Sequence, residues 1–365
     1  MKYICLLVVM IFATSLTAKD YTKEVIRNFK VNADAKLYLD NSRGKVTITT
    51  WDKNTIKIEA KIVVGAKSAA QAEEFFKQIK IDFEKNPAYV KATTEKKKQE
   101  ESWSDWLLGT AKNWDWKVEY KIIMPKTNRL SASNKFGDMY VSGVQGDSKV
   151  ELKFGDFQLS NFKDLDCDIS NGEGTISNVQ SLNIEIKHCE IKLRNAKNID
   201  IVSKHCEIDI DEASEIRSSS RNDDFEIGAV TELNSNGRYD DFVIGRVGTI
   251  KAVGKNSDFE IESILESGDF NLEYGELIID NLSTSLESLK LDGEYTDFVI
   301  DTENGTFNLI LNSEKTTVDT PNTMDKKSKT KENDILKLEG KVGKGQSNSL
   351  IQIKTKHGSL KIIQQ

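Results

Sequence analysis

The middle of the chain alternates apolar and polar residues in a unit that repeats along most of its length. Short segments such as DFEI, DFVI and EIDI mark the unit, and an acidic residue opens each one. Successive acidic residues are spaced by 18, then by 17 six times, then by 18 and 21. A period held this long indicates a repeat architecture. The acidic residues are Asp138, Asp156, Glu173, Glu190, Glu207, Asp224, Asp241, Asp258, Glu276 and Asp297.

Each unit predicts a coil made of short strands joined at corners. Alternation with a period of two is typical of strands with one buried face, and the two-residue gaps indicate corners where the chain turns without reversing. One coil cannot bury its apolar face, but a stack of coils can. We therefore predict an all-β fold, a parallel β-helix or solenoid of ~17-residue coils over residues 126–312. Phe225, Phe242 and Phe259 should stack as a buried aromatic ladder.

The segments on either side of the repeat have different patterns. Residues 19–125 predict a small β-rich entry module with a turn at Ser42-Arg43-Gly44. One helix is expected over residues 68–80, with Ser68 and Gln71 as a capping box. Residues 313–347 are polar and low in aromatics, which predicts a polar excursion or mobile loop. Residues 348–365 return to alternation and should form the closing strands of the solenoid.

Residues 1–18 have the pattern of a secretory signal peptide. Lys2 is followed by an apolar run that is too short to span a bilayer, and Ala18 ends a stretch of small residues before Lys19. No later run is long and apolar enough for a membrane span, so the mature chain should have no transmembrane segment. We expect an exported protein of the periplasm or the cell surface.

The charge of the chain restricts its partners. Lysine and arginine number 51 against 58 acidic residues, which gives a net charge of −7. This mild acidity argues against binding of nucleic acid, whose affinity for proteins depends on basic residues that contact phosphates.

The segment HCEI occurs twice, starting at His188 and again at His205, and raises the question of a metal site. Because side chains alternate along a strand, Cys189 and Cys206 should point inward while His188 and His205 point outward. Ligands on opposite faces cannot share one tetrahedral zinc, so we predict no metal site. Neighbouring coils would bring the two cysteines close enough for a disulfide, and the alternative is two buried free thiols.

Four of the five tryptophans lie in the polar segment of residues 96–116, between two expected strands of the entry module. Exposed indole rings suit stacking on sugars or docking to a partner. The alternative is that the rings pack on the entry module or cover the end of the solenoid. The candidate binding residues are Trp103, Trp106, Trp114 and Trp116.

The acidic residues that open the coils should form an outward stripe, with Asp224, Asp241 and Asp258 at its centre. Such a stripe is either a solvated structural feature or a calcium site, since Ca²⁺ prefers carboxylate oxygens. The pairs Asp223-Asp224 and Asp240-Asp241 also have the composition of a glycoside-hydrolysing site. The pairs recur with the repeat, however, whereas a catalytic pair should be unique.

Several segments make the chain resemble the bacterial putative-adhesin domain family. They are DNSRGKVTITTWDKNTIKIEAKIVV near the start, the coils FGDMYVSGV and FGDFQLSNF, and the closing HGSLKII. The resemblance implies an exported β-helical protein. It brings no catalytic residues and no cofactor.

These observations predict a non-enzymatic, adhesin-like or interaction protein of the bacterial cell envelope. Its partner would be an unknown envelope protein or glycan bound along the solenoid surface, because solenoids offer long regular faces. One alternative is a polysaccharide-active β-helix enzyme, a lyase or a hydrolase. Another is a periplasmic scaffold or signalling partner.

Overall fold

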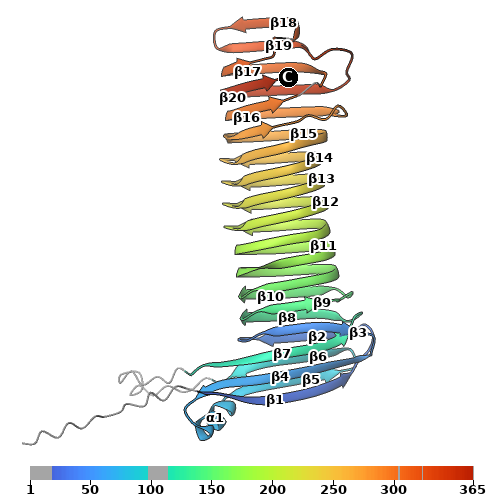
Figure 1. Ribbon diagram of the computed structural model, residues 1–365, viewed down its shortest axis with the longest axis vertical. Coiled ribbons are helices and arrows are strands. Elements are labelled where there is room, and N and C mark those ends of the chain that lie inside the picture. Colours follow the sequence, from blue (N-terminus) through green and yellow to red (C-terminus); the bar gives the residue numbers. More distant parts are fainter. Residues whose placement is uncertain (1–18, 98–113, 303–304, 323, 365) are drawn as a thin grey trace, which may run out of the picture.

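The chain folds into a long stack of β-strands with one short helix at one end (Figure 1). The computed structural model describes residues 19–97, 114–302, 305–322 and 324–364. Successive coils pair in parallel, which is consistent with a β-helix and confirms the expected mostly parallel, all-β chain. Within these described ranges, no helix has the length and apolar character needed to cross a membrane.

The central coils pair with a shift of one full repeat. Phe225 lies opposite Phe242, and Phe242 lies opposite Phe259, so that each column of the sequence repeat becomes a ladder. Several strands are continuous around corners, so that β11 alone spans more than one coil. The strands of this region are β11 (Phe157–Lys204), β12 (Glu207–Arg221), β13 (Asp224–Arg238), β14 (Asp241–Lys255) and β15 (Asp258–Ile279).

The predicted aromatic ladder is present in the core. The rings of Phe225 and Phe242 stack with centroids 4.5 Å apart, and those of Phe242 and Phe259 stack at 4.7 Å. All three side chains are at most 2% exposed. Each rung therefore buries an aromatic side chain against the rungs on either side, which stabilises the stack through the hydrophobic effect and ring stacking.

One corner of every coil places a residue in the left-handed backbone region. Asparagine and histidine are enriched in this conformation, whereas tyrosine adopts it less readily. The column runs from coil to coil, and the side chains point outward. We call this column the corner ladder; its left-handed members other than glycine are Asn171, His188, His205, Asn222, Tyr239, Asn256, Tyr274, Tyr295, His357 and Lys315.

The entry module shares one continuous sheet with the coils. β2 pairs in parallel with β6 and with β8, and β3 pairs in parallel with β7 and with β9. The remaining strands extend the sheet outward from these. Its strands are β1 (Lys19–Lys30), β2 (Lys36–Asn41), β3 (Val46–Trp51), β4 (Thr55–Ala66), β5 (Ile79–Asn86), β6 (Tyr89–Lys96) and β7 (Trp116–Pro125), and the first coils add β8 (Arg129–Phe136), β9 (Met139–Ser142) and β10 (Ser148–Phe154).

The helix α1 spans Ala69–Phe76 and is shorter than the predicted range of 68–80. Its N-cap is Ser68, whose Oγ accepts a hydrogen bond from the Gln71 N–H at 3.2 Å. The Gln71 side chain accepts from the Lys67 N–H at 2.8 Å, one residue before the cap. The helix ends early because β5 begins at Ile79 and pairs with β6.

The C-terminal part departs from the expected order. The polar residues 313–347 were predicted as an excursion or mobile loop, but they contain the end of β17 and the antiparallel pair β18 and β19. Every residue of β18 is exposed, so this strand has no apolar alternation that could reveal it. The strands are β16 (Ser288–Asp301), β17 (Phe307–Asp319), β18 (Asp325–Glu332), β19 (Ile335–Val342) and β20 (Leu350–Ile363).

The strand β20 lies between β16 and β17 and pairs in parallel with both. Chain order and spatial order therefore differ at this end of the stack. Ile353 lies opposite Leu291 of β16 and opposite Leu311 of β17. The hairpin of β18 and β19 covers the far side of β17 (Figure 1). The lysine-rich edge of β18 protects the end of the sheet against further strand pairing.

Candidate functional site: a cleft at the first coils

A cleft of about 620 Å³ lies where the entry module meets the first coils. Four structural segments contribute to it: the turn after β2, the end of β6, the start of β7 and the end of β8. The lining combines aromatic rings with two cationic side chains. Its residues are Ser42, Arg43, Lys96, Trp114, Asp115, Trp116 and Phe136.

Backbone pairing holds Arg43 in place at the cleft. The Arg43 carbonyl accepts from the Val118 N–H at 2.8 Å, and the next residue, Gly44, donates to the Phe136 carbonyl at 2.7 Å. Gly44 has a φ of +116°, and a Cβ there would come within 2.5 Å of the Val118 oxygen. Only glycine fits this turn, and the turn fixes Arg43 beside Phe136.

The side chain of Arg43 lies between an acid and a ring. Its Nη1 is 3.3 Å from Asp115 Oδ1, and its guanidinium carbon is 5.8 Å from the centroid of Phe136. Phe136 stacks in turn on Phe154 at 5.2 Å, and both rings are close to half exposed. Because Asp115 and Arg43 face water, their ion pair is weak and leaves the guanidinium available to a ligand.

The two described tryptophans of the candidate set have different surroundings. Trp114 is only 9% exposed and stacks on Phe75 of α1 at 4.2 Å, so it belongs to the core of the entry module. Trp116 is half-buried with its ring 6.4 Å from that of Trp114. Lys96 Nζ lies 4.5 Å from the centroid of Trp114, a cation–π contact. Trp103 and Trp106 lie outside the described residues.

In each carboxylate pair considered for hydrolysis, one aspartate is buried and the other is exposed. Asp223 and Asp240 are buried in the stack, whereas Asp224 and Asp241 are exposed. Asp223 Oδ1 accepts from the Cys206 N–H at 2.7 Å, and Asp240 Oδ1 accepts from the Asp223 N–H at 3.0 Å. Each buried carboxylate thus accepts a hydrogen bond from the backbone at the corner of the preceding coil.

Burial also alters the titration of these internal carboxylates. It raises the pKa of Asp240 to about 6, against which the hydrogen bonds from the Asp223 N–H and the Ser220 hydroxyl act. The pKa of Asp223 is raised for the same reason. Their oxygens are occupied by the protein itself, so the pairs lack the facing, accessible carboxyl groups that flank a glycosidic bond in glycosidases.

The acidic stripe has the predicted register. Asp224, Asp241 and Asp258 are directly opposite one another in successive coils, and all three are exposed. Partial burial, then repulsion from Asp258 and Asp224, raises the pKa of Asp241. Across the described part of the chain, no group of three or more histidine, cysteine or acidic side chains is arranged to hold a metal ion. Whether the stripe binds calcium stays a prediction to be tested.

The two HCEI segments are adjacent rungs, as the repeat predicts. His188 and His205 are exposed and stack at 5.0 Å, whereas Cys189 and Cys206 are buried free thiols. A hydrogen bond between the two thiols lowers the pKa of Cys189 to about 7 and raises that of Cys206. The histidines and cysteines therefore occupy opposite faces of the strand.

Comparisons with known proteins find solved structures of low sequence identity and low structural similarity to this chain. No family model and no curated protein matches it. A putative cell adhesion protein from Clostridium sporogenes is 10% identical over 94% of this chain and 100% of that one, with a TM-score of 0.25. A putative adhesin from Bacteroides fragilis is 15% identical over 70% and 97%, with a TM-score of 0.32. A putative lipid binding protein from Parabacteroides distasonis is 13% identical over 70% and 94%, with a TM-score of 0.23.

The cleft contains residues that the sequence did not single out. Arg43, Lys96 and Phe136 are far apart in the chain, and the pairing of β2 with β6 and β8 brings them together. One signal was available: FGD occurs at Phe136 and again at Phe154, one coil later. A phenylalanine before a glycine corner, outside the buried columns, indicates an exposed ring.

Proposed function

We propose that this chain is a non-enzymatic, adhesin-like interaction protein of the bacterial cell envelope, built as an exported β-solenoid. The cleft at the first coils would hold a carboxylate-bearing part of its partner, with an acidic envelope glycan as the favoured ligand. The observation that carries this proposal is the placement of Arg43 and Lys96 among the rings of Trp116 and Phe136. Aromatic edges and cations together suit a sugar that carries a negative charge.

The rigid frame around the cleft supports a binding role. Arg43 and Phe136 are held by backbone pairing of the sheet, so little side-chain and loop order is lost when a ligand binds. The polysaccharide-active alternative is disfavoured by the internal position of Asp223 and Asp240, whose oxygens hydrogen-bond neighbouring coils. A periplasmic scaffold remains the second candidate, and it would use the same surface for a protein.

Binding of acidic polysaccharides by the purified mature chain tests the proposal. Calorimetry should detect binding of a uronic-acid polymer and weaker or no binding of a neutral glucan. Arg43→Ala with Phe136→Ala should reduce the affinity at least about tenfold, because the variant removes a charge-assisted contact and an aromatic surface. Tyr295→Ala is the matched control, since it removes a similarly exposed ring far along the stack.

Two results would contradict this assignment. Binding that is equal in the cleft variant and in the control would place the ligand elsewhere. Appearance of new reducing or unsaturated ends in the polymer would show turnover and favour the enzyme alternative. Unchanged circular dichroism of each variant confirms that the exposed substitutions leave the fold intact.

A further inference from the structure

A stripe of basic residues runs along one side of the corner ladder. Each of its members directly precedes a ladder residue, and all are exposed or half-exposed. Pairing places Arg221 opposite Arg238, and Arg238 opposite Lys255. The basic stripe has one member in each of five successive repeats: Lys187, Lys204, Arg221, Arg238 and Lys255.

The acidic stripe runs along the other side of the same corner. Each acidic residue follows a basic one by three positions, and the residue between the ladder and the acid points inward. Both stripes therefore climb the same coils with the same spacing, ~4.8 Å per rung. Over these five coils the acidic stripe consists of Glu190, Glu207, Asp224, Asp241 and Asp258.

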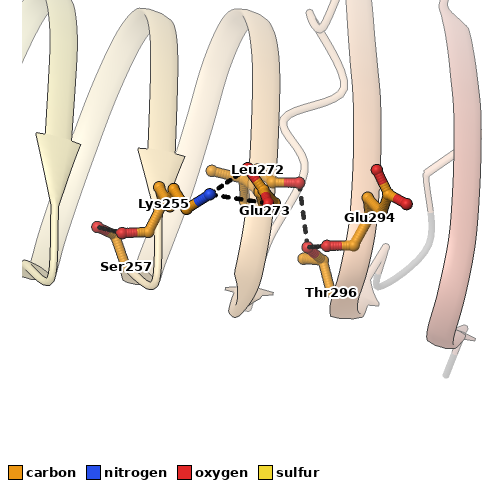
Figure 2. A network of polar contacts seen from close by, with 6 residues as sticks. All are labelled: Lys255, Ser257, Leu272, Glu273, Glu294 and Thr296. Atoms are coloured by element: carbon orange, nitrogen blue, oxygen red, sulfur yellow. Dashed lines mark hydrogen bonds and ion pairs between the residues drawn. The ribbon is translucent and has the colours of Figure 1, made fainter.

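The two stripes do not neutralise each other within the chain. Among the described residues, no ion pair joins a member of one stripe to a member of the other. Lys187 pairs with Glu185 of its own strand. Lys255 donates to both carboxylate oxygens of Glu273 in the next coil at 2.9 and 3.0 Å, as Figure 2 shows.

Figure 2 also shows where the basic stripe ends. After Lys255, the same column continues with Glu273 and Glu294, which are opposite each other. Within the described part of the chain, Lys204, Arg221 and Arg238 have no ion-pair partner. The unneutralised centre of the basic stripe thus lies beside Glu207, Asp224 and Asp241.

This arrangement does not suit a polyanion. The acidic stripe has as many charges as the basic one and lies across a single corner, within about one Debye length (~10 Å at 0.1 M salt). A long anionic chain on the basic side would be repelled by the acidic side along its whole length. A surface with the same pattern of opposite charges would be attracted on both sides, and a second copy of the chain has that surface.

Symmetry determines how two copies fit. A two-fold axis parallel to the stacking direction keeps each rung at its height and exchanges the two sides of the corner. Basic residues of one copy then face acidic residues of the other at every rung, on both sides of the corner ladder. A two-fold axis perpendicular to the stacking direction would instead place like charges together.

We propose that two copies of this chain associate side by side, parallel and in register, through the corners of the coils from Lys187 to Asp258. Arg221 and Arg238 of one copy face Asp224 and Asp241 of the other, and the reciprocal contacts form by symmetry. The ladder residues between them, with Tyr239 51% exposed at the centre, form the middle of the contact. This inference is independent of the cleft and of the proposed ligand.

The size and chemistry of the contact make it a weak one. A corner is narrow, so the buried area falls below the ~1600 Å² of a standard stable interface. Charged contacts at such a surface favour correct register and fast association more than high affinity. The association should therefore be strongest at low ionic strength and high protein concentration.

Charge reversal on each stripe, followed by mixing of the two oppositely charged variants, tests the proposal. Sedimentation equilibrium of the mature chain at low salt should show a monomer–dimer equilibrium. Arg221→Glu with Arg238→Glu makes the corner all acidic at two rungs, and Asp224→Lys with Asp241→Lys makes it all basic. Each double variant should self-associate at least about tenfold more weakly, because four attractive contacts per dimer become repulsive. An equimolar mixture of the two variants should recover dimers of one copy each.

The control is a pair of reversals on another face, Lys290→Glu with Lys354→Glu, which should leave the equilibrium unchanged. A wild-type chain that stays monomeric at low salt would overturn the proposal. Dimers that resist both reversals, or variants that fail to recombine, would also overturn it. Binding of a monomeric chain to polygalacturonate, lost in the Arg221→Glu, Arg238→Glu variant, would assign the basic stripe to a polyanion instead.

Discussion

At the scale of the residue, Asp240 shows what a buried charge does to this fold. Its carboxylate is removed from water at the corner of a coil and accepts from the Asp223 N–H and from Ser220. Gly237 leaves the necessary room, since a Cβ there would collide with Asp240 Oδ2. The carboxylate thus connects two coils, but its charged form is disfavoured by burial, which raises its pKa to about 6.

A pKa raised on folding means that the native state binds the proton more tightly than the unfolded chain. Stability from this group is therefore lost as pH rises from about 4 to 6, and the full loss persists at pH 7. Asp240→Asn should remove that loss, because the amide still accepts from the Asp223 N–H and needs no charge. We expect the variant to be more stable at pH 7 by on the order of 1–2 kcal/mol, with allowance for solvent screening.

Urea unfolding at pH 4, 5, 6 and 7 measures this difference. The gap between Asp240→Asn and the wild type should open as pH rises and be absent near pH 4. Asp224→Asn, one coil away and exposed, provides the comparison. Parallel pH curves for Asp240→Asn and the wild type would show that the carboxylate is not desolvated in the folded chain.

At the scale of the element, the column of Phe225, Phe242 and Phe259 carries much of the packing between coils. Phe242 is 1% exposed and has a stacked ring on each side, so Phe242→Ala leaves a cavity that neither neighbour can fill. The expected loss of unfolding free energy is about 3–5 kcal/mol. Val243→Ala, at a side chain that is 50% exposed, should change stability by less than about 0.5 kcal/mol.

Chemical denaturation of the two variants, side by side, checks the assignment of the columns. Equal midpoints for Phe242→Ala and Val243→Ala would contradict this assignment, and a lower midpoint for Val243→Ala would mean that the inward and outward positions are exchanged. A one-residue slip of register moves every side chain to the other face, so the comparison tests the whole strand.

The position of β20 predicts that the C-terminal segment becomes sensitive to protease when this strand is removed. Its pairing with both β16 and β17 makes it the connection between the coils and the C-terminal hairpin. Truncation after Ser349 removes this strand and leaves the strand edges at Leu291 of β16 and Leu311 of β17 without a pairing partner. The segment from 302 to 349 should then detach and become sensitive to protease, while the coils before it stay resistant.

Limited proteolysis with mass spectrometry reads this result directly. The coils from β11 to β15 are the internal control, because the truncation does not touch their pairing. Equal protection of residues 302–349 in the truncated and full-length chains would show that β17 can close the stack without β20.

The sequence predicted the coils well because their alternation reports burial directly. The inward columns and the outward position of His188 and His205 follow from the period of two. The left-handed corner was not predicted: asparagine and histidine are enriched in this conformation, but Tyr239 and Tyr295 in the same column are not residue types that signal it. Strand β18 was missed because no side chain in it is buried.

The cleft could be predicted only in part. Trp114 was a candidate ligand contact, with packing on the entry module as the stated alternative, and its stacking on Phe75 matches that alternative. Arg43, Lys96 and Phe136 come together through parallel pairing of strands distant in the chain. Local patterns report which face of a strand is buried, but they do not report which strands become neighbours.

At the scale of the whole molecule, a long stack places like charges in straight lines. Within the acidic stripe, partial burial raises the pKa of Asp241, and repulsion from Asp258 and Asp224 raises it further. A stripe of this kind is stabilised by any cation in solution through screening, whereas a calcium site requires six to eight oxygens around one ion. The geometry of single carboxylates, one per rung, favours screening over coordination.

Thermal melts with calcium chloride and with sodium chloride at equal ionic strength distinguish the two effects. We expect the same melting temperature in both salts, and no fall in EDTA, because part of the stripe is already hydrogen-bonded: Asp258 Oδ1 accepts from the Glu276 N–H at 2.7 Å. Asp241→Asn should raise the melting temperature slightly in low salt by relieving repulsion along the stripe. Saturable calorimetric binding of Ca²⁺ that is lost in Asp241→Asn would instead make the stripe a coordination site, with the ion holding neighbouring coils together.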